Sequence, residues 1–312
     1  MRASEEQLWA ILTQRLKARH FVLLSSVYRH RSLRKVADEM NLSQPAITKA
    51  LKEMEEIVGA ELFERTSRGL VPTPVAYLLV PRSAAFLEDL RNLAADLTAF
   101  HAGFHGTVRI GIIQFISYSL LTKAMDALRQ QGFNYRFVVH DGHTDALVDM
   151  LSRHELDCVI ARLTHVNSSE MEQEILYTQQ AVLLSNRAYQ SPNSRKLTIN
   201  DFATAEWVLP PKATPTRRAF EEMLVRSGVV IREPLVETIS VAAIKATLAS
   251  NEVCVTMLPR DLAEEIAAEG LCRILPVELD FLLPAVSLIT RRAAQSDRTL
   301  GALKRVIRAV AP

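Results

Sequence analysis

Long apolar runs are missing from this sequence. No stretch approaches the roughly 20 consecutive apolar residues that a helix needs to cross a bilayer, so we expect no membrane partner. The first residues, MRASEEQLWAILTQRL, are interrupted by charged and amide side chains, which the apolar segment of a secretory signal would not carry. We therefore expect a cytoplasmic protein.

Cysteine is scarce as well. The three cysteines, Cys158, Cys254 and Cys272, are far apart and odd in number. Each lies in an apolar, strand-like stretch (DCVIA, EVCVTM and LCRIL), which predicts small buried thiols. A redox sensor is the alternative, although no second cysteine lies near any of the three in the sequence.

Catalytic signatures are also missing. The sequence contains no G-x-S-x-G, no phosphate-binding P-loop and no G-x-G-x-x-G. Two histidine pairs, His140 with His143 and His101 with His105, have no cysteine or carboxylate cluster at metal-ligand spacing. We therefore expect neither an enzyme nor a bound metal or other cofactor.

The net charge of +2 does not by itself indicate a nucleic-acid partner. The distribution of charge is more informative, because one run near the N-terminus is basic and contains no acid. A solvated helix face would explain such a run, but next to a DNA-binding motif phosphate contact is favoured. The run consists of Arg15, Lys17, Arg19, Arg29, Arg31, Arg34 and Lys35.

The motif follows within residues 33–68. The apolar residues of LRKVADEM (33–40) and QPAITKALKEMEEIV (44–58) recur at helical spacing, which predicts two helices joined by a tight turn. Upstream, residues 4–30 predict one helix whose apolar stripe, starting at Leu8, packs beneath this pair. Together they predict a small helical domain.

The turn between the two helices has suitable residues. Asn41 tolerates a left-handed backbone, and we expect Leu42 to be an apolar plug in the turn. Ser43 is a good N-cap, and Pro45 suits the first turn of the second helix. These features predict a helix-turn-helix whose second helix lies in a DNA major groove.

An ordinary helical hairpin would show the same apolar pattern, and the polar residues favour DNA binding instead. Gln and Lys side chains near the start of the second helix suit base edges, and Thr suits phosphates or a thymine methyl. Beyond the helix, ELFERTSRGLVPTP predicts a basic wing able to reach the DNA backbone or minor groove. The predicted DNA-binding residues are Ser43, Gln44, Pro45, Thr48, Lys49, Lys52, Arg65, Arg68 and, from the basic run, Arg34.

Residues 43–74, SQPAITKALKEMEEIVGAELFERTSRGLVPTP, resemble the winged helix-turn-helix of the LysR-type transcriptional regulators. That family shows a Ser-Gln-Pro-Ala start to its recognition helix, then Gly, Leu-Phe-Glu-Arg and a Thr-Pro exit. The approach RLKARHFVLLSSVYRHRSLRKVA is similar to the subgroup that regulates sugar-binding-protein genes and aromatic-acid catabolism. Two departures, Met54 for Leu and Val75-Ala76 for Ala-Gly, lie off the predicted DNA face.

The resemblance implies a homodimer or a dimer of dimers that binds double-stranded DNA. Two recognition helices related by a two-fold axis would read a pseudo-palindromic site with half-sites roughly 34 Å apart or a multiple of that. The resemblance also implies a small-molecule effector, and RNA polymerase is a further candidate partner.

A long helix is predicted over residues 73–100. Its seven-residue repeat is typical of a helix that pairs with a partner helix, although a helix packed only on its own domain is the alternative. Pro81 should kink it or leave one carbonyl unpaired, and Gly103 and Gly106 should end it. The repeat consists of Ala76, Ser83, Leu90 and Leu97, and of Leu79, Phe86, Leu93 and Phe100.

From residue 107 onward, strand-like and helix-like segments alternate. Such alternation predicts mainly parallel sheets with helices on their faces. The resemblance implies an effector domain like the periplasmic binding proteins, with a second α/β subdomain inserted into the first. The expected fold is thus α+β and multi-domain: a winged helix-turn-helix domain at 1–74, a linker and dimerisation helix with hinge at 75–106, and an effector domain at 107–312. Subdomain I would comprise 107–178 and 281–312, and subdomain II 179–280.

A ligand site is expected beyond the C-terminal ends of the strands, where helix N-termini offer free N–H groups. Hydroxyls at helix starts with one arginine suit a carboxylate or another small anion. The alternatives are that Thr144, Thr216 and Ser240 are only N-caps and that Arg162 pairs with Asp157. The predicted effector-binding residues are Gln114, Phe115, Ser117, His143, Thr144, Arg162, Thr214, Thr216, Thr238 and Ser240.

These patterns together predict a sequence-specific DNA-binding regulator of LysR type. A small carboxylate or a sugar-derived metabolite, bound between the α/β subdomains, would control it. The alternative is a small-molecule-binding module whose helix-turn-helix serves protein contacts.

Overall fold

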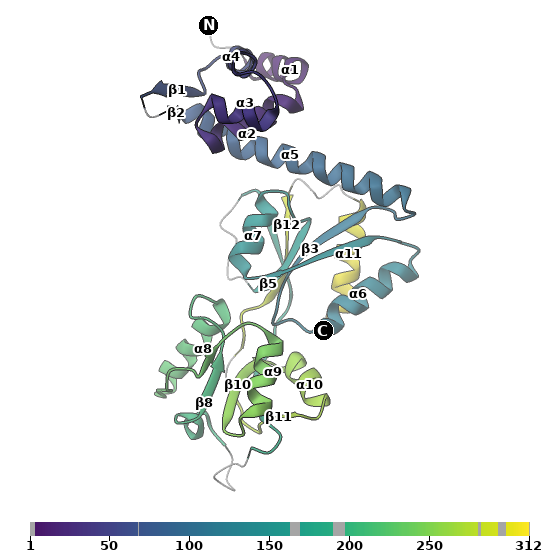
Figure 1. Ribbon diagram of the computed structural model, residues 1–312. Coiled ribbons are helices and arrows are strands. Elements are labelled where there is room, and N and C mark those ends of the chain that lie inside the picture. The colour runs from purple at the N-terminus through teal and green to yellow at the C-terminus, as the bar shows by residue number, and fades with distance from the viewer. Residues whose placement is uncertain are drawn as a thin grey trace. The chain divides into compact units, whose positions relative to one another are not determined.

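The computed structural model describes residues 4–67, 69–162, 169–189, 197–279, 282–292 and 298–311. The chain divides into two compact units, Met1–Thr98 and Ala99–Pro312 (Figure 1). Among the described residues, no helix is both long enough and apolar enough to cross a membrane.

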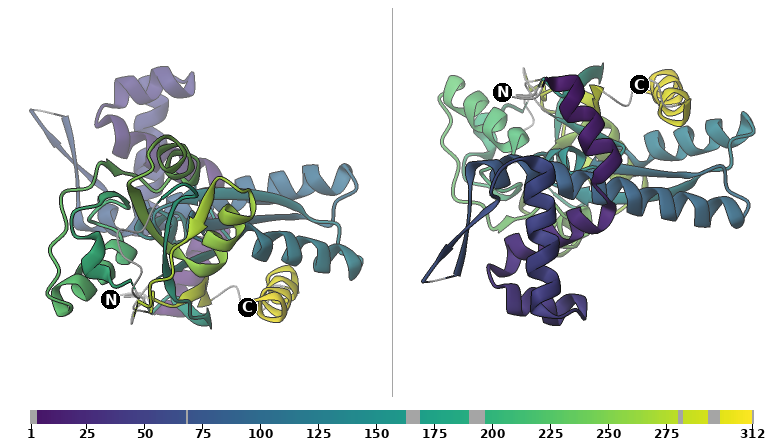
Figure 2. Two further views of the ribbon diagram at one scale, coloured as in Figure 1. Left: turned by 90° about the horizontal axis from the view of Figure 1, so that it is seen from below. Right: turned by 90° about the horizontal axis from the view of Figure 1, so that it is seen from above.

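The first unit is a group of helices with one β-hairpin, which projects from the helices in both views of Figure 2. Side chains from α2, α3, α4, the hairpin and the start of α5 form its core, among them Leu24, Val36, Ile47 and Leu70. The predicted winged helix-turn-helix is therefore confirmed. The elements are α1 (Glu5–Arg15), α2 (Ala18–His30), α3 (Leu33–Met40), α4 (Gln44–Val58), β1 (Phe63–Thr66), β2 (Gly69–Pro72) and α5 (Pro74–His101).

The single helix expected over residues 4–30 is wrong. Extended backbone at Leu16 and Lys17 separates α1 from α2. The Lys17 N–H donates to Nδ1 of His20 (3.3 Å), so a side chain in the first turn of α2 satisfies the backbone at the break. α1 contains no buried residue, and Leu8 is 39% exposed, so the part of the expected stripe that lies in α1 stays outside the core, whereas Leu24 and Val27 of α2 are buried in it.

The turn between α3 and α4 follows the prediction in part. Asn41 has a left-handed backbone (φ 53°), and the Ser43 hydroxyl accepts the Ala46 N–H (3.3 Å) as the N-cap of α4. Leu42, however, is 50% exposed, so it is not a plug. Its N–H donates to the Ala37 carbonyl (3.0 Å), and this backbone bond closes the turn instead.

Helix α5 continues past Pro81 to His101. A proline has no N–H, so the helix loses one hydrogen bond there without ending. In the first half of the predicted repeat, Ala76 and Ser83 are buried. The second half is exposed, with Phe86, Leu90, Leu93, Leu97 and Phe100 between 38% and 66% accessible.

The second unit contains two five-stranded sheets, each with helices on both faces. The first sheet has α7 on one face and α6 and α11 on the other (Figure 1). Its strand order is β4-β3-β5-β12-β6. Its elements are β3 (Thr107–Ile113), α6 (Tyr118–Gln130), β4 (Arg136–Gly142), α7 (Thr144–Ser152), β5 (Cys158–Arg162), β6 (Met171–Tyr177), β12 (Val286–Arg291) and α11 (Arg298–Val310).

The second sheet has the order β11-β7-β10-β8-β9 and is built from the chain between β6 and β12. The expected insertion of one subdomain into the other is therefore confirmed. Its elements are β7 (Ala181–Asn186), the 3-10 helix η1 (Ile199–Phe202), β8 (Glu206–Leu209), α8 (Pro215–Arg226), β9 (Val236–Glu237), α9 (Val241–Ser250), β10 (Cys254–Pro259), α10 (Arg260–Ala268) and β11 (Cys272–Ile274).

The expectation of mainly parallel sheets is wrong, because both sheets are mixed. In the first sheet β3 runs parallel to β4 and β5, whereas β12 runs antiparallel to β5 and β6. In the second sheet β7 runs antiparallel to β10 and β11. β6, which the sequence pattern did not predict, belongs to one of these antiparallel pairs, and β11, within the strand-like stretch LCRIL, belongs to another.

Along β3, successive side chains point to opposite faces of the first sheet. Val108, Ile110 and Ile112 join the core beneath α6 and α11. On the opposite face a Cβ at Gly111 would lie 2.7 Å from a methyl carbon of Leu156, so only glycine lets this face pack so closely. The period-2 pattern of TVRIGII therefore fixes the orientation of β3, whose C-terminal end borders the cavity described below.

All three cysteines are buried free thiols, as predicted. Burial raises the pKa of each thiol above its usual value, and that of Cys254 reaches about 11. A raised pKa keeps the thiol protonated and unreactive at neutral pH, which opposes the redox-sensor alternative.

Candidate DNA-binding surface and ligand cavity

The candidate recognition helix α4 carries six of the predicted DNA-binding residues at or near its N-terminus. Gln44, Thr48 and Lys52 are four residues apart and therefore follow one side of the helix. Thr48 is half-buried, and its hydroxyl donates to the Gln44 carbonyl (3.0 Å). The other five are exposed: Ser43, Gln44, Pro45, Lys49 and Lys52.

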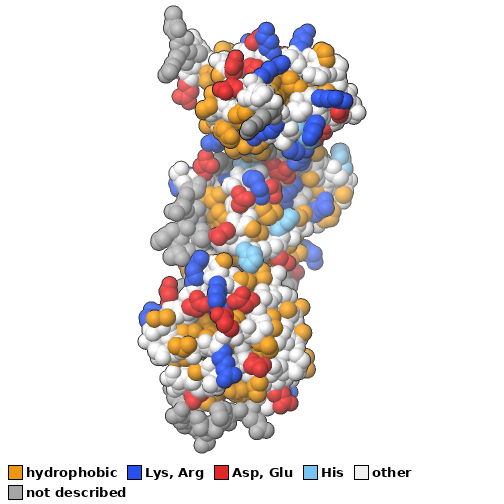
Figure 3. Space-filling model, turned by 60° about the vertical axis from the view of Figure 1, so that its left-hand side comes forward, with side chains coloured by type: hydrophobic (Ala, Val, Ile, Leu, Met, Phe, Trp, Pro, Cys, Tyr) orange, Lys and Arg blue, Asp and Glu red, His pale blue; other side chains and the backbone are white. Residues whose placement is uncertain are grey.

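Two further predicted DNA-binding residues are basic and lie outside α4. Arg34 in the first turn of α3 and Arg65 on β1 are exposed. Arg68 lies outside the described residues. Basic side chains stand at several places on the face of this unit that is drawn in Figure 3. Exposed arginines of this kind are free to contact DNA phosphates.

The hairpin is attached to the helices at Gly69. The Leu70 N–H donates to the Arg31 carbonyl (3.0 Å), next to the turn between α2 and α3. Gly69 has φ +116°, and a Cβ there would lie 2.8 Å from the same carbonyl oxygen. Only glycine satisfies both conditions, so this residue fixes the base of the wing.

A cavity of about 200 Å³ opens between the two sheets of the second unit. It lies at the C-terminal ends of β3, β4, β5 and β8. Most of the predicted effector-binding residues border it: Gln114, Phe115, His143, Thr144, Arg162, Thr214 and Thr216.

Three predicted residues lie elsewhere. Ser117 and Ser240 border a neighbouring hollow of about 380 Å³, which shares Gln114 with the cavity. The Ser117 hydroxyl donates to Oε1 of Glu265 (2.5 Å), across the two subdomains. Thr238 borders neither space, and its hydroxyl accepts the Ser240 N–H (3.0 Å). The predicted effector-binding residues therefore do not all border one space.

Two helix N-termini reach the cavity. His143 is the N-cap of α7 and makes no side-chain capping bond, whereas Thr214 caps α8 by accepting the Arg217 N–H (3.3 Å). Thr144 and Thr216 lie inside their helices, so the N-cap alternative is wrong for both and right for Ser240. Helix N-termini favour an anionic ligand group.

Arg162 is the most deeply buried polar side chain in the cavity wall, at 1% exposure. Its Nη1 donates to the Pro284 carbonyl (2.8 Å), and its Nη2 to the Phe115 carbonyl (3.4 Å) and to Oε1 of Gln179. The alternative of an Asp157 partner is wrong, because the Asp157 carboxylate pairs with Arg109 (3.8 Å). Burial lowers the pKa of Arg162 to about 10, so the guanidinium keeps its charge at neutral pH.

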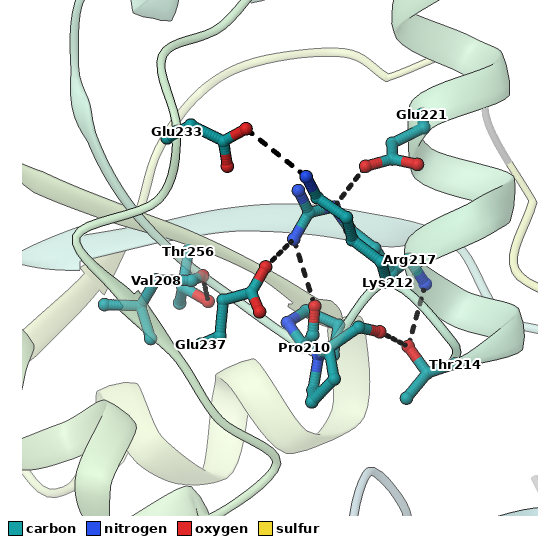
Figure 4. Close-up of polar contacts among 10 residues, drawn as sticks. Val208, Pro210, Lys212, Thr214, Arg217, Glu221, Glu233, Glu237 and Thr256 are labelled. Atoms are coloured by element: carbon teal, nitrogen blue, oxygen red, sulfur yellow. Dashed lines mark hydrogen bonds and ion pairs between the residues drawn. The ribbon is translucent and has the colours of Figure 1, made fainter.

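A second buried arginine, Arg217, holds the opposite wall in place (Figure 4). Its Nε lies 2.8 Å from Oε1 of Glu221, and its Nη1 lies 3.3 Å from Oε1 of Glu237. The same Nη1 donates to the Pro210 carbonyl (3.1 Å). This network anchors the segment from Pro210 to the start of α8, which borders the cavity.

Several lining residues were not predicted. Pro210, Pro211, Pro215 and Ile239 give the cavity apolar walls, and Asp145 adds one exposed carboxylate. The strand-end rule selected polar residues only, so it passed over the apolar ones. The PP and TP pairs around residues 210–215 mark a stiff loop beyond a buried strand, which was the available signal.

Metal ligands do not gather in the part of the chain that the structure describes. No group of three or more His, Cys, Asp or Glu side chains there could hold a metal ion. The side chains that border the cavity offer hydrogen bonding, charge and apolar contact.

A winged helix-turn-helix unit joined to a two-sheet unit with a cavity between its sheets defines a class of ligand-controlled transcriptional regulators. Residues 18–77 match the family described as "Bacterial regulatory helix-turn-helix protein, lysR family". Residues 101–312 match the family described as "LysR substrate binding domain". The chain belongs to the LysR family of DNA-binding transcriptional regulators.

Similar proteins of known name support this membership over the whole chain. The HTH-type transcriptional regulator GalR of Pseudomonas putida is 31% identical over 310 residues, which cover 99% of this chain and 76% of that protein. PcaQ of Agrobacterium fabrum is 26% identical, with 96% of this chain and 97% of that protein covered. GbpR of Azospirillum brasilense is 28% identical, with 86% and 79% covered.

Solved structures show the same fold. A full-length OxyR variant from Pseudomonas aeruginosa has a TM-score of 0.61 at 18% identity, covering 95% of this chain and 96% of that one. CbnR, described as a LysR family transcriptional regulator, has a TM-score of 0.60 at 16% identity, covering 95% and 100%.

Proposed function

We propose that this regulator reads DNA with the exposed face of α4 and responds to a small carboxylate, including sugar-derived acids, bound in the cavity between the two sheets. The observation that carries the ligand class is Arg162. This buried guanidinium borders a cavity and is hydrogen-bonded only to neutral acceptors. Burial lowers its pKa, and the Asp261 carboxylate is near enough to oppose this but does not bond to it, so its charge is incompletely compensated and an anionic ligand would bind there favourably.

The walls of the cavity agree with this ligand class. The N-termini of α7 and α8 both reach the cavity, and their free N–H groups add to the positive potential. The Thr216 hydroxyl and the His143 imidazole suit the hydroxyl groups of a sugar acid. The Thr144 and Thr214 hydroxyls already donate to the Arg162 (3.3 Å) and Pro211 (2.8 Å) carbonyls, so toward a ligand they would act as acceptors. The prolines and Ile239 suit an aromatic or aliphatic body.

On the DNA side, α4 would enter the major groove and the β1–β2 wing would contact the backbone. Gln44 is suited to base edges, because its amide can donate and accept at once. Arg34 and Arg65 are suited to phosphates, because they are exposed guanidinium groups.

Dimerisation through α5 is part of the proposal. The exposed repeat from Phe86 to Phe100 has the spacing of a two-helix seam, and a helix with such a stripe is stabilised by covering it. A two-fold dimer would set two copies of α4 on half-sites about 34 Å apart or a multiple of that. Contact with RNA polymerase stays a prediction.

The test of DNA recognition is a fluorescence-anisotropy titration with DNA from upstream of the gene, at two salt concentrations and with shuffled DNA as competitor. Gln44→Ala should reduce the preference for the specific site, whereas Arg65→Ala should weaken binding to every sequence. Arg226→Ala, an exposed arginine of the second unit, is the matched control. Equal losses for both variants on all sequences would contradict the division of roles.

The ligand class is tested by calorimetric titration of the full chain with three probes. Gluconate is a hydroxylated carboxylate, benzoate is an aromatic one, and glucose has the hydroxyl groups of gluconate without its charge. We expect at least one carboxylate to bind and glucose to bind more weakly. Binding of glucose alone would contradict an anionic ligand.

A further inference from the structure

Two short chain segments connect the subdomains. One lies between β6 and β7, and the other precedes β12. They pair with each other, because the Leu283 N–H donates to the Gln179 carbonyl (3.0 Å) and Gln180 forms an antiparallel bridge with Leu282. Any rotation of one subdomain against the other must bend this pair of segments, so they form the hinge.

The Arg162 side chain is bonded to both hinge segments at once. Nη2 donates to the Gln179 side chain on the first segment, and Nη1 donates to the Pro284 carbonyl on the second (2.8 Å). Nη2 also reaches the Phe115 carbonyl in the loop between β3 and α6 (3.4 Å). A guanidinium is planar and rigid, so moving one of its nitrogens moves all three.

One atom of the same group has no partner. The Nε of Arg162 is buried and finds no acceptor among the described residues, although a buried donor without an acceptor is costly. Arg162 is also part of the cavity wall. The residue therefore joins the hinge to the cavity and has hydrogen-bonding capacity that the protein does not use.

We propose that Arg162 is the positioning residue that sets the angle between the two subdomains and that a bound anion acts on this angle by competing for its guanidinium. The part that involves the anion rests on the proposed function. The guanidinium prefers one orientation while it is bonded only to Gln179, Pro284 and Phe115. An anion in the cavity that accepts hydrogen bonds from the guanidinium favours a different orientation. The equilibrium between the two subdomain angles then shifts by the difference in the anion's binding free energy for the two orientations.

The test measures the distance between the subdomains in the full-length protein. Spin labels are placed at Ser152→Cys on subdomain I and Arg226→Cys on subdomain II, both of which are exposed positions. The three native cysteines are buried, so labelling is selective. Labelled protein is diluted with unlabelled protein so that distances within one chain dominate.

The decisive variant is Gln179→Met, which removes a hinge bond of Arg162 and alters no residue of the cavity wall. We expect its distance distribution without ligand to be about twice as broad as that of the wild type, because the hinge loses a bond that restrains it. Gln173→Met is the matched control, since Gln173 donates to Ser287 (3.0 Å) within subdomain I. A distribution for Gln179→Met that equals the control would overturn the hinge role.

The effect of a bound anion on the angle between the subdomains is tested separately. With saturating gluconate or benzoate, whichever binds, the mean distance should shift in the wild type and shift at most half as far in Gln179→Met. Binding with no shift in the wild type would overturn the coupling and leave the ligand class standing. If neither carboxylate binds, the proposed ligand class and the anion's part in the coupling are both contradicted, whereas the distances without ligand still decide the hinge role.

Discussion

Two buried arginines support opposite walls of the same cavity and are compensated in opposite ways: Arg162 borders the cavity, whereas Arg217 anchors a segment that borders it. Arg217, in subdomain II, faces two carboxylates, Glu221 and Glu237, at 2.8 and 3.3 Å. Arg162, in subdomain I, has two carbonyls and one amide oxygen and leaves Nε without an acceptor among the described residues. A paired buried charge holds structure together, whereas one bonded only to neutral groups remains available to an anionic ligand.

A third buried basic group, in the DNA-binding unit, extends the comparison. His20 is 1% exposed, its Nδ1 accepts the Lys17 N–H, and its Nε2 is 4.0 Å from Glu53. Desolvation lowers the pKa of His20, and the Glu53 carboxylate only partly opposes this. A histidine can lose its proton when burial makes charge costly, but an arginine cannot do so near neutral pH.

The largest expected effect is a loss of stability when Arg217, the arginine paired with two carboxylates, is replaced. Arg217→Met should lower the free energy of unfolding by about 2–3 kcal/mol. Removing one partner of a buried pair usually costs more, but Glu221 and Glu237 are both 41% exposed and regain water. Urea denaturation followed by the fluorescence of Trp207, which packs on Phe220 of the same helix as Arg217, measures the loss.

The control for that variant is Arg226→Met on the exposed face of α8, which should change stability by less than about 0.5 kcal/mol. Equal losses at the two positions would show that the Arg217 network is not a structural anchor, and the contrast between the two cavity walls would fail.

The second effect concerns binding. Arg162→Met should weaken gluconate binding by about 10- to 100-fold, because a hydrogen bond to a charged group contributes about 1.5–3 kcal/mol. Glucose binding should change much less, since glucose offers no charge. Calorimetric titration of both probes measures this. Unchanged gluconate affinity would place the anion elsewhere in the cavity.

The smallest effect is a pH dependence in the DNA-binding unit. Because the folded state holds the pKa of His20 below its ordinary value, the unfolded state takes up the proton first as the pH falls through about 6.5. Stability should therefore be full above that pH and decline below it, at no more than about 1.4 kcal/mol per pH unit.

Thermal unfolding of the wild type and of His20→Gln at pH 5, 6 and 7 tests this. The variant cannot take up the proton, so its stability should fall less between pH 7 and pH 5. Identical pH profiles would mean that His20 can become protonated in the folded protein without cost.

The structure of the DNA-binding unit could be predicted from the sequence in detail. Its motif is contiguous, and local rules decide it: the Ser43 cap, the left-handed Asn41 and the apolar repeat of α4. The errors were also local. The Lys17–His20 bond ends one helix early, and a backbone hydrogen bond closes the turn where Leu42 was expected to be buried.

For the second unit, the sequence predicted only that ligand-binding residues would follow the C-terminal ends of the strands. The rule that ligands lie beyond these ends selected residues that do border the cavity, because helix starts after parallel strands gather at one edge. It could not separate Thr144 from Ser240, which border different spaces. The alternation of strands and helices also did not show which strands run antiparallel, since pairing direction depends on partners far away in the chain.

The sequence by itself therefore determined the family, the helix-turn-helix, the α/β alternation and the hydroxyls and arginine available to a ligand, because each depends on residues within one or two turns of each other. Only the tertiary structure decided which arginine is paired. Arg217 finds Glu221 on its own helix and Glu237 from another strand, whereas Arg162 meets two hinge segments that come from distant parts of the chain. Burial and partner set the role of a charge, and both arise only when those segments come together.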